Sequence, residues 1–174
     1  MKNNILTILY IIILILLVYL IQLYFINERE LFGVKPNLIL ILSIVISLWF
    51  GVYIGGISSL IIGIFTDMLF GNIGIFTISY TIVGIIVGIL NNNYRKESKM
   101  SLVYVTIIAT FVFEISEYLC YLFLFNISSS IFYLLKQIVI SSLLNIVIVY
   151  IIYSVIFKIT ESIEDRIIKN SNCF

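Results

Sequence analysis

Between residues 38 and 90, a stretch of 53 residues, the chain carries a single charged side chain, that of Asp67. As one helix this stretch would be about 80 Å long, far more than the ~30 Å hydrocarbon thickness of a bilayer. It therefore has to turn back on itself within a membrane. An apolar stretch of this length indicates several membrane-spanning helices in succession.

The composition of the whole chain supports the same class of protein. Hydrophobic residues make up 62% of the 174 residues and charged residues 11%, whereas soluble domains carry about 25% charged residues. There is too little polar surface to cover a globule in water. The long apolar runs do not alternate with period two, which favours helices over the strands of a membrane barrel.

The interruptions of the apolar runs predict six transmembrane helices in a single polytopic domain, 1–174. Gly51 with Gly55-Gly56 marks one break in the long stretch, and residues 71–74 mark another, because clustered glycines interrupt helices. Pro36 suits the first position of a helix. The predicted spans are 5–26, which we interpret as a retained first helix, then 36–51, 54–70, 73–90, 101–125 and 131–157.

The distribution of Lys and Arg predicts which ends of these spans face the cytoplasm. Six spans with both termini inside place seven basic residues in the cytoplasm and three outside. Five spans with the N-terminus outside would place eight basic residues in the cytoplasm and two outside. The charge rule therefore does not separate the two alternatives. Both place the 91–100 loop and the C-terminal tail in the cytoplasm.

The sequence shows no constellation of catalytic residues of a known kind. The chain has no histidine, and its two aspartates are Asp67 in an apolar run and Asp165 in the tail. This excludes a histidine base and disfavours a pair of catalytic aspartates. No glycine-rich phosphate loop with Lys-Ser or Lys-Thr occurs, and we expect no cofactor or metal. We therefore predict a non-enzymatic protein.

The most specific local pattern is a row of small residues at a spacing of four, in which Gly51, Gly55, Ser59 and Gly63 precede Asp67. Residues four apart share one face of a helix, and small side chains there let another helix approach closely in lipid. The next span carries Gly84 and Gly88 at the same spacing. These residues are predicted either to pack the third span against the fourth or to bind the transmembrane helix of a partner.

Polar side chains within the apolar runs are the other candidate functional residues, because ionisable groups are expensive in a bilayer. Asp67 is expected either to cap the turn at residues 71–74 or to act directly in function. Glu114 and Glu117 share a face of the fifth span, and Lys136, Gln137 and Asn145 lie on the sixth. A pair between Glu117 and Lys136 is predicted from their similar depth. A proton or cation path and a partner contact are the alternatives.

Part of this pattern resembles the family of the rod-shape-determining protein MreD. The resemblance is carried by residues 36–88: Pro36-Asn37, the row from Gly55-Gly56 through Ser59 and Gly63 to Asp67, Gly71-Asn72-Ile73-Gly74, Tyr80, and Gly84 with Gly88. It implies a non-enzymatic multi-pass subunit of the machinery that elongates the bacterial side wall, in the cytoplasmic membrane. Its implied partners are membrane lipid, the single-span protein MreC, and through it the actin-like MreB and wall synthases.

The resemblance also implies a fold like that of the six-helix substrate-binding subunits of vitamin transporters. Such a transporter subunit is therefore the second functional hypothesis. The absence of Gly, Ala and Ser from residues 5–26 argues against it, because those subunits usually dock through small residues on the first span. A holin-like or purely structural membrane protein is the third.

Overall fold

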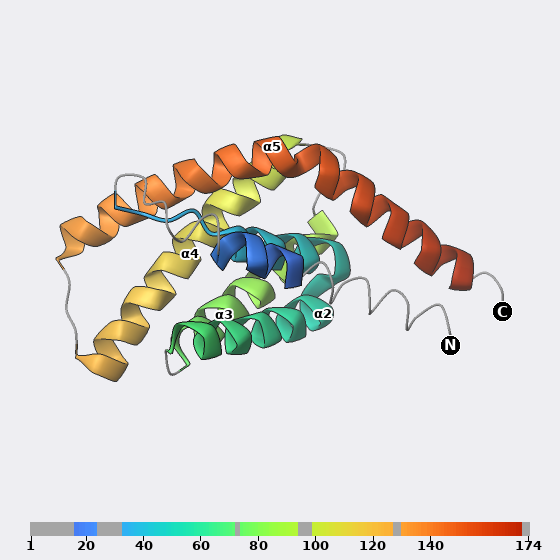
Figure 1. Ribbon diagram of the computed structural model, residues 1–174. Helices are drawn as coiled ribbons and strands as arrows, with labels where there is room; N and C mark the ends of the chain where they lie inside the picture. Colours follow the sequence, from blue (N-terminus) through green and yellow to red (C-terminus); the bar gives the residue numbers. More distant parts are fainter. Residues whose placement is uncertain (1–15, 24–32, 72–73, 94–98, 127–129, 172–174) are drawn as a thin grey trace.

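The computed structural model describes residues 16–23, 33–71, 74–93, 99–126 and 130–171, apart from the side chains of 92–93, 152 and 154–171. Within these ranges the chain forms helices, as predicted (Figure 1): α2 (Leu38–Phe70), α3 (Ile75–Ile89), the short 3₁₀ helix η2 (Leu90–Asn93), α4 (Lys99–Phe125) and α5 (Ile131–Ser171). Residues 16–23 are helical as well. In the described part of the chain, three helical segments are long and apolar enough to cross a membrane by length and composition, namely α2, α4 and Ile131–Ile151 of α5, and α3 is a shorter apolar helix.

Helix α2 consists of two arms that fold back on each other at Gly51. The backbone of Gly51 has φ 78° and ψ −173°, which is not helical and which only glycine adopts readily. The hydroxyl oxygens of Ser43 and Ser59 lie 2.7 Å apart, although a straight helix would separate these residues by about 24 Å. The two arms, 38–50 and 52–70, are therefore antiparallel, and Figure 1 shows the chain reversing at this point.

The first arm is the centre of the molecule. Every residue from 39 to 48 is buried, whichever side of the helix it lies on. A helix that is apolar all round is stable only when other helices cover it on all sides. The last turn of the first arm is hydrogen-bonded to η2, because the side-chain amide of Asn91 donates to the carbonyl of Leu48.

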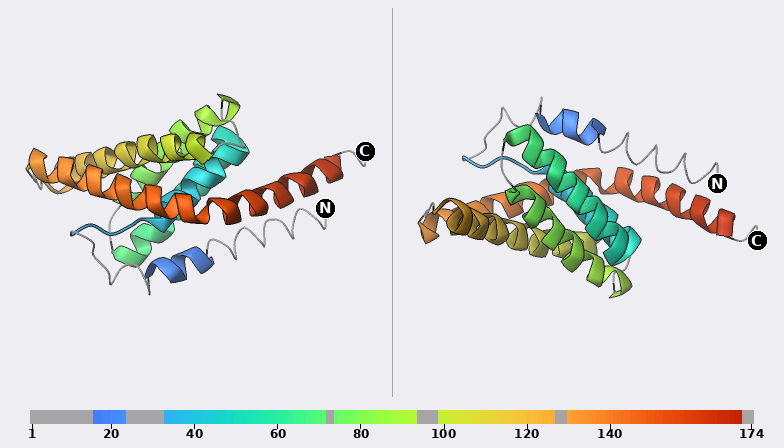
Figure 2. Two further views of the ribbon diagram at one scale, coloured as in Figure 1. Left: turned by 90° about the horizontal axis from the view of Figure 1, so that it is seen from above. Right: turned by 90° about the horizontal axis from the view of Figure 1, so that it is seen from below.

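The second arm continues through a glycine turn into α3, which runs back beside it (Figure 2). Gly71 ends the arm with φ 70°, and Gly74 precedes α3 with φ 80°. Both are left-handed conformations that glycine adopts at little cost. The predicted break at residues 71–74 therefore matches the end of α2 and the start of α3.

Three boundaries differ from the sequence prediction. Pro36 precedes the helix, because the side chain of Asn37 caps it by accepting from the backbone N–H of Leu40 at 2.9 Å. Gly55 and Gly56 do not break α2, whose kink is at Gly51 alone. Helix α5 continues beyond the predicted end at 157 to Ser171, since no glycine or proline interrupts it. Most of the predicted first span, 5–26, lies outside the described residues.

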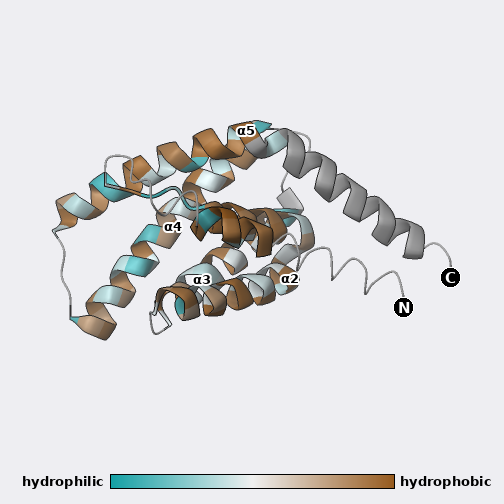
Figure 3. Ribbon diagram, in the orientation of Figure 1, coloured by the Kyte–Doolittle hydropathy of each residue, from teal (hydrophilic) through white to brown (hydrophobic). Residues whose placement is uncertain are grey.

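Helices α4 and α5 form a V that is open at the end where α4 finishes and α5 begins (Figure 1). At the narrow end, the ammonium of Lys99 lies 5.7 Å and 5.4 Å from the ring centroids of Tyr150 and Tyr153. Cation–π contacts at these distances stabilise the approach of the two helices. Colouring by hydropathy shows polar residues among the apolar ones along both helices (Figure 3).

Candidate functional site

A network of polar side chains joins four helical segments at Asn37. The hydroxyl of Tyr80 on α3 donates to Oδ1 of Asn37 at 3.1 Å. The backbone N–H of Asn37 donates to Oδ1 of Asn145 on α5 at 3.2 Å. The amide of Asn145 in turn donates to the Thr110 hydroxyl on α4 at 3.2 Å. The start of α2 is thereby bonded to α3 and α5 directly, and to α4 through Asn145.

Gln22 extends this network to the helical segment 16–23. Its side chain donates to the carbonyl of Pro36 at 3.0 Å and accepts from the backbone N–H of Leu38 at 2.9 Å. These bonds satisfy backbone groups at a helix start, which would otherwise be unpaired inside the protein. Tyr80, Asn145 and Gln22 are almost completely buried, with 1%, 1% and 5% of their surfaces exposed.

Asp67 caps the start of the following helix. Its carboxylate accepts from the backbone N–H groups of Phe76 at 3.0 Å and Thr77 at 2.9 Å, and from the Thr77 hydroxyl at 2.5 Å. The N-cap residue of α3 is Gly74, which has no side chain to offer. The carboxylate thus also lies where the helix dipole favours a negative charge. This contact explains how a charged residue is accommodated at the end of an apolar arm.

Apart from Gly51, which forms the kink and has no atom near its Cβ position, the row of small residues lies at contacts between helical segments of the same chain. A Cβ placed on Gly55 would be 2.6 Å from Cα of Ser47 on the first arm, and one on Gly88 would be 2.6 Å from Cα of Val52. A Cβ on Gly63 would meet the backbone of Thr77. In these positions even a methyl group would collide with backbone atoms. We call this set of contacts the glycine contact; its residues are Gly55, Ser59, Gly63, Thr77, Gly84 and Gly88.

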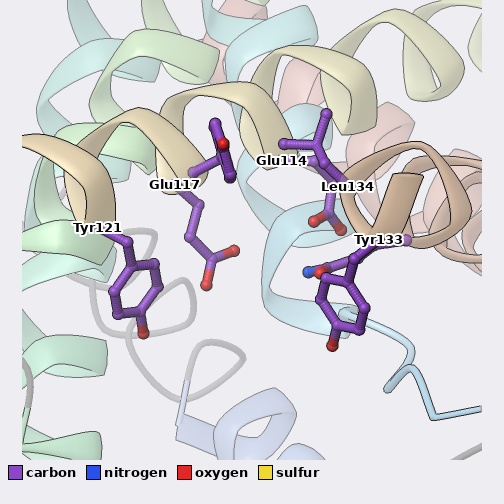
Figure 4. Close-up of a pocket in the computed structure, with 7 residues that line it drawn as sticks. Glu114, Glu117, Tyr121, Tyr133 and Leu134 are labelled. Carbon is purple, nitrogen blue, oxygen red and sulfur yellow. The ribbon is translucent and has the colours of Figure 1, made fainter. Parts of the chain in front are cut away.

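A cavity of ≈350 Å³ lies between α4 and α5 on the wide side of the V. It is lined from α4 by Glu114, Glu117, Tyr118 and Tyr121, and from α5 by Tyr133, Leu134 and Gln137. Figure 4 shows the Glu117 carboxylate between the hydroxyl groups of Tyr121 and Tyr133, all directed into the opening. Carboxyl, phenol and amide groups therefore share this wall with apolar surface.

The acidic residues of this cavity differ in their bonding. Glu114 is 8% exposed and lies close to the side chains of Ser141 and Gln137 on α5. Glu117 is partly exposed, and Lys136 is exposed on α5. Within the described part of the chain neither of these two forms an ion pair, so the predicted Glu117–Lys136 pair is not formed. The similar depth of the two residues did not fix which way each side chain points.

Sequence reasoning gave no role to Gln22 or Thr110, and it noted Tyr80 and Asn37 only as part of a family pattern. Single amides within apolar runs, such as Gln22, are the signal that would have identified them, because a buried amide needs partners. Among the described residues, no group of three or more Cys, Asp or Glu side chains is placed to hold a metal ion.

These features define a multi-pass helical membrane protein whose polar side chains join its helices to one another. A family model described as rod shape-determining protein MreD matches residues 2–163, nearly the whole chain. The chain belongs to the MreD family. No curated protein and no solved structure matches it, so the likeness to vitamin-transporter subunits stays a prediction.

Membership of this family makes the chain a rod-shape-determining membrane protein of bacteria, active in cell shape and wall elongation. The family is associated with the MreC and MreB shape machinery and is not a known enzyme family.

Proposed function

We propose that the chain is a non-enzymatic subunit of the wall-elongation machinery in the bacterial cytoplasmic membrane. In this role it binds an MreC-like single-span protein and, through that protein, MreB and the wall synthases. The family match over residues 2–163 carries this proposal. The geometry supports it, because the polar side chains of the Asn37 network and of Asp67 join helices to one another, as expected of a scaffold.

The position of the glycine contact bears on where a partner would bind. Gly55, Gly63 and Gly88 are already in contact with other parts of this chain. We therefore expect the partner's helix to bind side chains that face lipid. Well-exposed examples from three helices are Met68 on α2, Phe111 on α4 and Leu143 on α5.

Complementation in a rod-shaped bacterium depleted of its own family member tests the function. The chain should restore rod shape and should co-purify with the MreC-like protein. Photo-crosslinking residues at 68, 111 and 143 would then identify the helix that the partner contacts. Cells that stay round although the chain accumulates in the membrane, in the presence of its cognate MreC-like protein, would contradict the proposal.

We also propose six spans with both termini in the cytoplasm. The first arm of α2, 38–50, has 13 residues and a length of about 20 Å, which is shorter than the bilayer core. The non-helical residues 33–37 add about 16 Å if they are extended. Together they have the reach of one crossing, and the Asn37 network supplies partners for backbone that is not helical at this depth.

Cysteine labelling tests this topology. Cysteines introduced at Lys2 and Lys99 should both be protected from a membrane-impermeant reagent added outside. Labelling at position 2 together with protection at position 99 would contradict the six-span topology and support five spans.

A further inference from the structure

The cavity between α4 and α5 combines three features that the scaffold role does not use. It has a volume of ≈350 Å³, its lining includes two carboxyl groups and three phenols, and Glu117 on its wall has no ion pair in the described chain. Small-molecule sites in proteins measure roughly 300–1,000 Å³. A carboxylate in a membrane protein is expensive unless a cation or hydrogen-bond donors compensate it.

The lining groups define the chemistry of the occupant. Glu117 points into the opening (Figure 4), where a carboxylate binds an ammonium group best, by charge-assisted hydrogen bonds. The hydroxyl groups of Tyr121 and Tyr133 flank it and can accept further N–H bonds. An occupant with a primary ammonium group therefore fits this wall better than an anion or a neutral group.

Lys136 does not line the cavity but is the basic residue of α5 nearest to it along the sequence. It lies three residues after Tyr133 and next to Gln137, both of which line the cavity, and residues three apart are neighbours on a helix. It is exposed and has no ion pair among the described residues. An occupant that carries an anionic group close to its ammonium would compensate both charges.

The cavity lies inside the ends of both helices, close to the boundary between the head groups and the hydrocarbon of a bilayer. Counted from the nearer helix ends, Glu117 lies eight residues from Phe125 and Lys136 five residues from Ile131, which is about 12 Å and 8 Å along the helices. Exposed apolar side chains continue from the cavity toward the middle of both helices, among them Phe111 at 49% and Leu143 at 59%. Such surfaces accommodate acyl chains.

We propose that this cavity binds the head group of an aminophospholipid such as phosphatidylethanolamine. Glu117 binds the ammonium, Lys136 binds the phosphate, and the acyl chains lie on the exposed apolar faces of α4 and α5. The proposal goes beyond the scaffold function and does not depend on a protein partner.

Native mass spectrometry of the purified full-length chain in neutral detergent tests this inference, with phosphatidylethanolamine, phosphatidylcholine and phosphatidylglycerol of identical acyl chains. Phosphatidylethanolamine should bind most tightly. Phosphatidylcholine has no N–H donors and phosphatidylglycerol has no cation, so both should bind more weakly. The isosteric variant Glu117→Gln should lose roughly tenfold or more in affinity for phosphatidylethanolamine, as the loss of a charge-assisted hydrogen bond implies.

Two tyrosine variants provide a matched comparison. Tyr133→Phe removes a hydroxyl from the cavity, whereas Tyr104→Phe removes one from an exposed position of α4 that does not line it. The first should weaken binding of phosphatidylethanolamine and the second should not. Equal binding of the three lipids, or unchanged binding in Glu117→Gln, would overturn the proposal and leave a cavity filled with water.

Discussion

The α2–α3 half of the molecule and the α4–α5 half are both built from apolar helices, yet they pack in opposite ways. In the first half, backbones meet directly at Gly55, Gly63 and Gly88. In the second, the helices meet through side chains, as between Asn145 and Thr110, and diverge around a cavity of ≈350 Å³. All nine glycines of the chain occur between residues 33 and 88.

This difference follows from how helices associate in lipid. Because lipid tails are as apolar as the side chains, association depends on van der Waals contact and interhelical hydrogen bonds. Glycine allows the backbones to approach, which gives a close-packed unit. Helices α4 and α5 lack glycine and carry bulky aromatic residues, so they remain apart where no polar bond joins them. The first half is thus suited to rigidity and the second to binding.

The largest expected effect comes from filling the glycine contact. Gly63→Leu would push a branched side chain into the backbone of Thr77. We expect a loss of more than about 3 kcal/mol in the free energy of unfolding, above the usual cost of overpacking. The measurement is thermal unfolding in detergent together with the amount of protein in the membrane.

A bulky residue at the adjacent position is the control. Ile64→Phe adds volume where the side chain is 37% exposed and should change stability by about 0.5 kcal/mol or less. If Gly63→Leu folds as well as Ile64→Phe, the close contact is not what stabilises this half.

A smaller effect separates two neighbouring glycines. Gly55→Ala brings a methyl group to 2.6 Å from Cα of Ser47, whereas on Gly56 the nearest atom is Cγ1 of Ile85 at 3.3 Å. We expect Gly55→Ala to cost about 1–3 kcal/mol. Gly56→Ala should be neutral or stabilising by up to about 1 kcal/mol, because alanine favours helix. Equal unfolding midpoints for the two variants would contradict the proposed geometry.

The smallest effect is expected at the cavity between α4 and α5. In detergent without added lipid, Glu117→Gln and Lys136→Gln should be additive, with a coupling free energy below about 0.5 kcal/mol. A double-mutant cycle of thermal unfolding measures this coupling. A coupling of about 3 kcal/mol or more would instead indicate the buried pair that the sequence predicted.

The sequence predicted the helical class and the two reversals of the long apolar stretch, because clustered glycines mark both. It could not distinguish a glycine that bends the chain, such as Gly51, from one that admits a neighbouring helix, such as Gly55. Both uses require the absence of a side chain, and only the backbone conformation separates them. The Glu117–Lys136 prediction failed because depth along a helix says nothing of rotation about its axis or of divergence between helices.

The bond between Asn37 and Asn145 has a consequence for biosynthesis. The backbone N–H of Asn37 finds its acceptor on a residue 108 positions later in the chain. At ribosomal rates of about 5–20 residues per second, roughly 5–20 s pass between the synthesis of the two. During that interval the entry to α2 lacks one of its final partners. The nascent chain therefore completes its centre only when α5 has been synthesised. Truncation within α5 before Asn145 should thus destabilise the first arm of α2, although that arm is synthesised long before α5.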